Sequence, residues 1–258
     1  MKELASYLAA YDWDTMKRFI ISEIEKQNGP DFNFDRLNSL SWIVGSLCGA
    51  IFDKEEKTFF ISTLRTLLQL CEMKKGKENK AVVASCIMYV VGQYPTFLKN
   101  NWSFLKTVIK KLFEFMKEEF PGIMEMAVNA FLKIVKSTAD QFTIIQSNDS
   151  QPYINEIIKR IPDEIKKLKA DSLRLTFYQS IGYLINAEKN SDLQLEMMKE
   201  TLGEHFFQFQ NIMGSVQNDP NILKNEEVEQ RLLYFLKMNE SLVIGVGEQY
   251  YQPVSYTH

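Results

Sequence analysis

The stretches EKTFFISTLRTLLQLCEMK, residues 56–74, and TFLKNNWSFLKTVIKKLFEFMKE, residues 96–118, decide the fold. In both, apolar residues recur every three or four positions, which is the spacing of one buried helix face. The members of this face are Phe60, Leu67 and Leu70 in the first stretch, and Leu105, Ile109, Leu112 and Met116 in the second. Both stretches are therefore predicted to be amphipathic α-helices.

Each of these helices carries a second apolar face beside the first. Its members are Ile61, Leu64, Leu68 and Cys71 in 56–74, and Phe104, Val108 and Phe115 in 96–118, where Lys111 interrupts the face. The second faces are either core, because inner helices of an array pack on two sides, or the walls of an exposed groove that binds an amphipathic peptide. The groove is favoured by a basic cluster that would give it a positive rim for an acidic ligand: Lys74, Lys75, Lys77, Lys80 and Lys111.

Helical periodicity continues along the rest of the chain, and proline and glycine fall mainly at its breaks. The predicted helices are 2–10, 13–28, 36–52, 56–74, 78–94, 96–118, 121–139, 151–168 with a kink or split at Pro162, 172–187, 192–217 and 221–246. Successive pairs begin about 40 to 55 residues apart, close to the HEAT-repeat period. These features predict an all-α fold, a superhelical solenoid of stacked antiparallel helix pairs, with a compact helical bundle as the alternative.

Composition excludes several classes of function. The 30 basic and 33 acidic residues give a net charge of −3, which argues against direct nucleic-acid binding. The first residues do not form a signal peptide, and no run approaches the length of a membrane span. The three cysteines, Cys48, Cys71 and Cys86, indicate reduced thiols in the cytosol or nucleus.

Catalysis has little support in the sequence. Only two histidines occur, His205 and His258, and no zinc-ligand spacing, nucleophile elbow or phosphate-binding glycine loop is present. We therefore expect neither an enzyme nor a metal or cofactor site.

The segment LLQLCEMKKGKENKAVVASCIMYVVGQYPTFLKNNWSFLKTVIKKLFEFMKE, residues 67–118, closely resembles the central repeats of the chromosome-region-maintenance exportin family. Members of this family are karyopherin-β receptors for leucine-rich nuclear export signals. LNSLSWIVGSLCGAI at 37–51 resembles the preceding repeat, and FYQSIGYLI at 177–185 resembles a later one. The resemblance is strong over about residues 35–135 and becomes weaker beyond them.

The resemblance implies an export-signal groove on the outer surface, within 56–126. The groove positions it implies are Ile61, Leu64, Leu68, Cys71, Ala84, Met88, Phe97, Phe104, Val108, Phe115 and Met126, with Lys77, Lys80 and Lys111 at the basic rim. It also implies that electrophilic export inhibitors attack Cys71. The groove stripes of 56–74 and 96–118 follow from periodicity independently of the resemblance.

The resemblance further implies partners and a location. The partners are cargo proteins with leucine-rich signals, Ran GTPase in the full-length receptor, and nucleoporins, and the receptor shuttles between nucleus and cytoplasm. We expect residues 1–258 to be one HEAT-repeat array of about five helix pairs, a piece of a longer receptor. The alternative is a HEAT-repeat scaffold or import-type karyopherin segment that binds a different protein ligand.

Overall fold

The computed structural model describes residues 3, 7, 12–30, 32–50, 53–120, 122–147 and 149–247. Within these ranges the regular elements are all helices, and they contain no strand. The predicted helix 2–10 and the C-terminal tail from 250 onward fall almost wholly outside them. The prediction of an all-α HEAT-repeat fold is confirmed. The chain divides into two compact units, 1–133 and 134–258.

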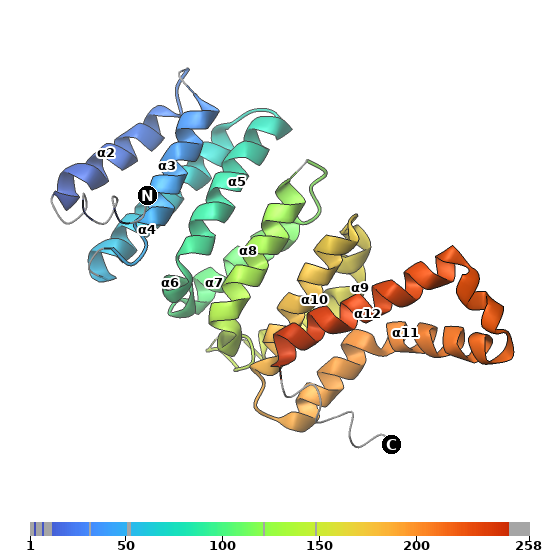
Figure 1. Cartoon of the computed structure of the whole chain (residues 1–258). Coiled ribbons are helices and arrows are strands. Elements are labelled where there is room, and N and C mark those ends of the chain that lie inside the picture. The colour runs from blue at the N-terminus through green and yellow to red at the C-terminus, as the bar shows by residue number, and fades with distance from the viewer. Residues whose placement is uncertain are drawn as a thin grey trace. The chain divides into compact units, whose positions relative to one another are not determined.

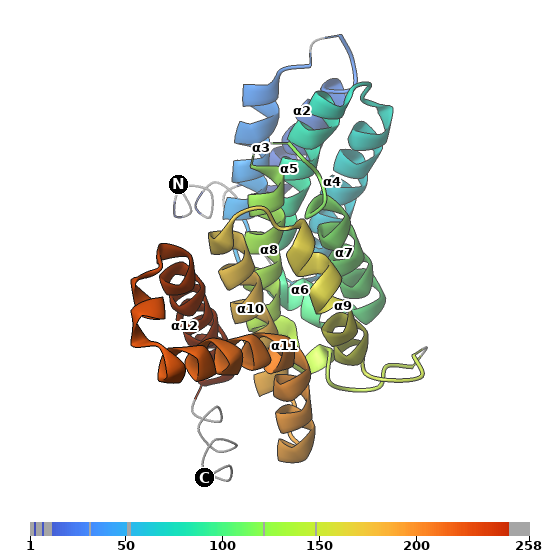
Figure 2. The ribbon, with the colours of Figure 1, turned by 90° about the vertical axis from the view of Figure 1, so that its right-hand side faces the viewer.

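The described residues of the first unit contain three successive helix pairs. Its helices are α2 (Trp13–Lys26), α3 (Phe34–Ser46), α4 (Asp53–Met73), α5 (Lys77–Gln93), the short α6 (Pro95–Lys99), α7 (Trp102–Phe115) and most of α8 (Ile123–Thr138). α5 packs against both α3 and α4, and the rings of Phe113 on α7 and Phe131 on α8 lie 5.3 Å apart. Figure 2 shows α4 and α7 on one side of α5.

The prediction of a single helix over 96–118 is wrong, because the helix is interrupted between α6, which ends at Lys99, and α7, which begins at Trp102. The side-chain amide of Asn101 donates a hydrogen bond of 2.7 Å to the carbonyl of Phe97. Asparagine side chains compete with the backbone for such bonds, and so favour helix ends over helix interiors. Phe97, on α6, contacts both neighbouring helices, since its ring centroid lies 4.8 Å from that of Phe60 on α4 and 5.7 Å from that of Phe104 on α7.

An aromatic cluster joins the helices of this unit. Phe60, on α4, is fully buried, and its ring centroid lies 4.4 Å from that of Tyr94, between α5 and α6. The Tyr94 hydroxyl donates a hydrogen bond of 2.7 Å to the carbonyl of Val44 on α3. The cluster therefore connects the consecutive helices α3, α4 and α5 through buried contacts.

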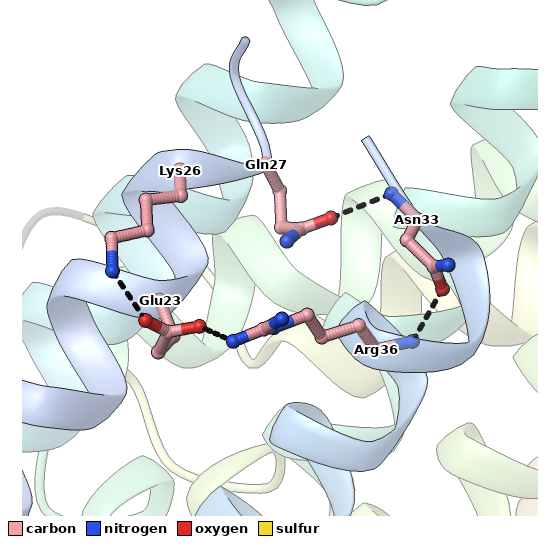
Figure 3. Close-up of polar contacts among 5 residues, drawn as sticks. All are labelled: Glu23, Lys26, Gln27, Asn33 and Arg36. Carbon is pink, nitrogen blue, oxygen red and sulfur yellow. Dashed lines mark hydrogen bonds and ion pairs between the residues drawn. The ribbon is translucent and has the colours of Figure 1, made fainter. Parts of the chain in front are cut away.

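The connection between α2 and α3 is held by a buried carboxylate (Figure 3). Glu23 lies between two cations: Lys26, whose Nζ is 2.5 Å from Oε1, and Arg36, which contacts Oε2. The Lys26 hydrogen bond, more than the Arg36 contact, holds the pKa of Glu23 below its usual value. Beside this group, the side-chain oxygen of Gln27 accepts a hydrogen bond of 2.8 Å from the backbone N–H of Asn33. The side-chain oxygen of Asn33 in turn accepts from the backbone N–H of Arg36 and so caps α3.

We predict that Glu23 makes the first unit acid-sensitive. Since its folded-state pKa is depressed, Glu23 stabilises the fold above the ordinary glutamate pKa and ceases to do so as pH falls through the folded-state value. Glu23→Gln should lower the melting temperature at pH 7 and reduce its fall between about pH 5 and 3. Melting curves against pH measure this, with the exposed Glu25→Gln as control. Equal pH profiles for Glu23→Gln and the wild type would contradict it.

The second unit contains α9 (Tyr153–Lys167), α10 (Asp171–Asn186), α11 (Ser191–Asn218) and α12 (Glu226–Val246). It also contains the 3-10 turns η1 (Ala139–Gln141) and η2 (Pro220–Lys224). Of the predicted kink or split at Pro162, the split is wrong, because α9 is continuous through this residue. Burial of Ile161 and the other isoleucines of α9 offsets the cost of about 3 kcal/mol for an interior proline.

The predicted helix 221–246 is also wrong at its start. Residues up to Lys224 form η2, and α12 begins only at Glu226. The side-chain oxygen of Asn225 accepts hydrogen bonds from the backbone N–H groups of Glu227 and Val228. This N-cap opens a new helix in place of continuing the preceding turn.

α10 and α12 approach each other so closely that only glycine fits at their crossing (Figure 1). A Cβ atom on Gly182 would lie 2.5 Å from the carbonyl oxygen of Leu242, and one on Gly245 would lie 2.4 Å from that of Gln179. Both would-be contacts are with backbone, which cannot rotate away. The two glycines therefore set the separation of the helices.

Alanine substitutions at helical glycines should accordingly change stability in opposite directions. Gly182→Ala should destabilise the fold by about 1–3 kcal/mol through overpacking. Gly203→Ala, on α11, should stabilise it by about 0.5–1 kcal/mol, since a Cβ there meets nothing within 4 Å. Urea denaturation measures both. Equal effects would mean that the crossing tolerates a side chain.

Among the residues described, no helix is both long and apolar enough to cross a membrane.

Candidate functional site

The second apolar faces of α4 and α7 line a groove whose floor is α5. Its central hollow, of about 410 Å³, is walled by Leu68 and Cys71 on one side and by Phe104, Val108 and Phe115 on the other. A second hollow of about 410 Å³ adjoins it toward Phe97, and a third of about 220 Å³ adjoins it toward Lys77. Neighbouring hollows share lining residues, so they form one continuous groove.

Exposure within the groove rises from the floor to the rim. Ala84 and Met88, on α5, are each only 2% exposed. Ile61 and Leu68, on α4, are 37% and 42% exposed, which is unusual for large apolar side chains. Phe104, Val108 and Phe115 are half-buried. The second faces are therefore open to solvent, although Leu64 between them is buried.

The structure brings nearly all of the predicted groove residues together. Those that line the three hollows are Ile61, Leu64, Leu68, Cys71, Ala84, Met88, Phe97, Phe104, Val108, Phe115, Lys77, Lys80 and Lys111. Met126, on α8, is half-buried and lies outside the lining of these hollows. This placement is geometric, and the peptide-binding role of these residues stays a prediction.

Several residues that line the groove were not predicted from the sequence. Ile87 and Val91 continue the floor that Ala84 and Met88 begin, and their spacing of three or four residues would have revealed them. Glu72 and Thr107 also line the central hollow. Periodicity does not find these two, because polar residues at a helix surface are expected everywhere.

Lysines and glutamates share the rim. Lys111 Nζ lies 2.7 Å from Oε2 of Glu114, one turn along α7, and both side chains are more than half exposed. Such an exposed pair contributes only about 0.2–1 kcal/mol, so a ligand can compete for either partner. Lys77 and Lys80 are exposed at the far end of the groove.

Cys71 is half-buried beside the α5 backbone, with its Sγ 3.7 Å from the carbonyl oxygen of Lys80. Burial raises the pKa of the thiol, and Glu72 raises it further, while Lys80 and Lys111 oppose the shift. Burial dominates because the lysines are exposed and their charges are screened by water.

The other two cysteines differ from Cys71 in surroundings. Cys86 is buried within α5, and burial also raises its pKa. Cys48 follows the end of α3 and is half-buried. No group of side chains suited to a metal ion occurs within the described ranges.

Sequence comparisons relate this chain to a known family. Residues 28–78, which include α3 and α4, match the family model described as CRM1 / Exportin repeat 3. Exportin-1 of Dictyostelium discoideum is 36% identical over 256 residues, which are 99% of this chain and 24% of the relative. Protein EXPORTIN 1A of Arabidopsis thaliana matches to the same extent, and Exportin-1 of Schizosaccharomyces pombe is 38% identical over 227 residues.

The chain is related by sequence to the exportin-1 family. It spans about a quarter of the length of the exportin-1 proteins that it matches. The match to the Dictyostelium discoideum exportin-1 covers nearly the whole chain, so it includes the α4–α7 groove and the second unit alike.

We predict that an apolar Michael acceptor labels Cys71 of this exportin-1 relative before Cys48 and Cys86. The apolar groove concentrates the reagent at Cys71, whereas Cys86 is buried. Because burial raises the thiol pKa, labelling should accelerate as pH rises from about 7 to 9. Peptide mass spectrometry after limited reaction measures the order. Earlier modification of Cys48 or Cys86, or a rate independent of pH, would contradict this.

Proposed function

We propose that this chain is part of a nuclear export receptor and that its α4–α7 groove binds leucine-rich nuclear export signals. The observation that carries the proposal is the open apolar groove, which lies in a chain related to exportin-1. Its walls are two helices with exposed apolar side chains, and its floor is a third. An amphipathic peptide with apolar residues at i, i+3, i+4 and i+7 would fill such a groove.

The binding energy would be mainly hydrophobic. Four apolar anchors that contribute ~2 kcal/mol each on burial give a gross gain of ~8 kcal/mol. Association costs of ~4–15 kcal/mol offset most of this. At most ~4 kcal/mol then remains, so these anchors alone give the isolated chain a dissociation constant of about 1 mM at best. Tighter binding by a longer receptor would require a coupled partner that orders the groove, and we propose Ran GTPase for that role.

Charge at the rim would select among peptides. Lys77, Lys80 and Lys111 favour ligands with acidic residues between or beside the anchors. An acidic leucine-rich peptide should therefore bind more tightly than a basic import-type signal. A preference for the basic peptide would favour an import-type or scaffold role instead.

The wider role follows from the same family relationship. We propose that residues 1–258 form one HEAT-repeat array within a receptor that shuttles between nucleus and cytoplasm. Its partners would be signal-bearing cargo, Ran GTPase and nucleoporins. The role needs binding and release of protein ligands and includes no catalytic step.

We predict that Leu68→Ser with Phe115→Ser raises the dissociation constant of an acidic leucine-rich peptide by at least about tenfold. These residues face each other across the central hollow from α4 and α7. They are better targets than Phe104, whose ring lies 6.2 Å from that of the buried Phe60. Fluorescence anisotropy with a labelled peptide measures the affinity.

The matched control is Leu236→Ser, a 59% exposed leucine on α12 that is remote in sequence from the groove. It should leave peptide affinity unchanged, and circular dichroism should show native helicity for both proteins. Unchanged peptide affinity in the double variant would contradict the proposal that the peptide binds in this groove. Lost affinity together with lost helicity would show that Leu68 and Phe115 are core residues.

A further inference from the structure

A fourth cavity continues the groove beyond Phe97. It holds about 280 Å³ and is formed by the α3–α4 connection, the start of α4 and the region around α6. Phe97 and Asn101 line both this cavity and the adjoining groove hollow. A peptide that occupies the groove as far as Phe97 would therefore place its next residues at the mouth of this cavity.

Glu56 supplies the carboxylate of this cavity, whose lining also includes the polar side chains of Lys57, Thr96 and Asn100. Both carboxylate oxygens of Glu56 share one donor, the N–H of Gly49, at 3.1 Å each. A carboxylate has roughly four acceptor sites, so one N–H leaves capacity for further donors. The amide nitrogen of Asn101 is already engaged with the Phe97 carbonyl, which leaves its amide oxygen as the other acceptor.

The rest of the lining is suited to an aliphatic stem. The rings of Tyr94 and Phe97 contribute apolar surface, and the Tyr94 hydroxyl is occupied by the Val44 carbonyl. Lysine and arginine combine a long apolar stem with a donor head, which matches a lining that contains two aromatic rings and a carboxylate. The ring of Phe97 already has a cation near it, since Lys57 Nζ lies 5.8 Å from its centroid.

We propose that this Glu56 cavity is a subsite for a lysine or arginine that flanks the ligand anchor packed on Phe97. The proposal rests on the proposed function of the groove. In the subsite, the stem of the ligand side chain packs along Tyr94 and Phe97, and its charged head donates to Glu56. Lys57 competes for the same place with its own ammonium. The groove would then select acidic residues near Lys77 and a basic residue at the opposite end.

The test compares labelled peptides that share one acidic leucine-rich core. Each carries one added flank residue, at either end of the core: lysine, norleucine, which has nearly the same stem without the charge, or glutamate. Binding to the 258-residue chain is measured by fluorescence anisotropy. At one end of the core, lysine should bind about three- to fivefold more tightly than norleucine, the effect of one partly exposed ion pair.

Three variants assign the effect. Glu56→Gln, which retains an acceptor for the Gly49 amide, should abolish the preference for lysine over norleucine. Glu55→Gln, the exposed neighbour, should retain it. Lys57→Met, which removes the competing ammonium, should increase it.

The outcomes separate this subsite from the groove itself. Equal affinity of the lysine and norleucine peptides, or tighter binding of the glutamate peptide at both ends, would overturn the subsite while leaving the groove intact. A lysine preference that survives Glu56→Gln would also overturn it. Failure of the unextended core peptide to bind would overturn the proposed function, and the subsite with it.

Discussion

The contact between the rings of Phe60 and Tyr94 is the constraint on which the groove depends. Phe60 is a fully buried residue of α4. The hydroxyl of Tyr94 donates a hydrogen bond to the carbonyl of Val44 on α3. Successive residues of a helix point about 100° apart, so fixing Phe60 inward fixes the rotation of the whole of α4. Ile61, and Leu68 two turns later, must then point to the groove side. Rotating them into the core would expose Phe60 and separate its ring from that of Tyr94.

The same cluster determines one end of the groove. The ring centroid of Phe97 lies 4.8 Å from that of Phe60 and 5.7 Å from that of Phe104. Aromatic pairs at such distances prefer defined relative orientations, which gives this end of the groove a fixed shape. Toward Lys77 the lining changes to flexible lysines and the half-buried Cys71. The two ends of the groove therefore differ, because lysines line only the end that contains Lys77 and Lys80 beside Phe115 and Phe120.

The chemistry of the groove follows from the balance between burial and screened charge. Lys80 and Lys111 are both near enough to Cys71 to favour its thiolate, yet burial outweighs them. Their charges face water, where the dielectric weakens them, whereas desolvation acts directly on the sulfur. Glu23 shows the opposite balance, because its buried carboxylate has two cations in contact and its pKa falls. Direct contact, more than the number of nearby charges, decides the direction of each shift.

Much of the fold was determined by the sequence itself. Periodicity located the helices, glycine and proline marked most of their ends, and the double apolar faces of 56–74 and 96–118 marked the groove walls. The sequence misled at three places: a side-chain hydrogen bond of Asn101 accompanies the interruption of the predicted helix 96–118, Asn225 caps the late start of α12, and Pro162 does not split α9. Only the tertiary structure decided whether the second faces were core or open, whether Glu72 belongs to the groove, and whether burial or the nearby lysines govern the pKa of Cys71. Periodicity reports the direction in which a side chain points, but its exposure and pKa depend on what packs over it, and those neighbours come from distant parts of the chain.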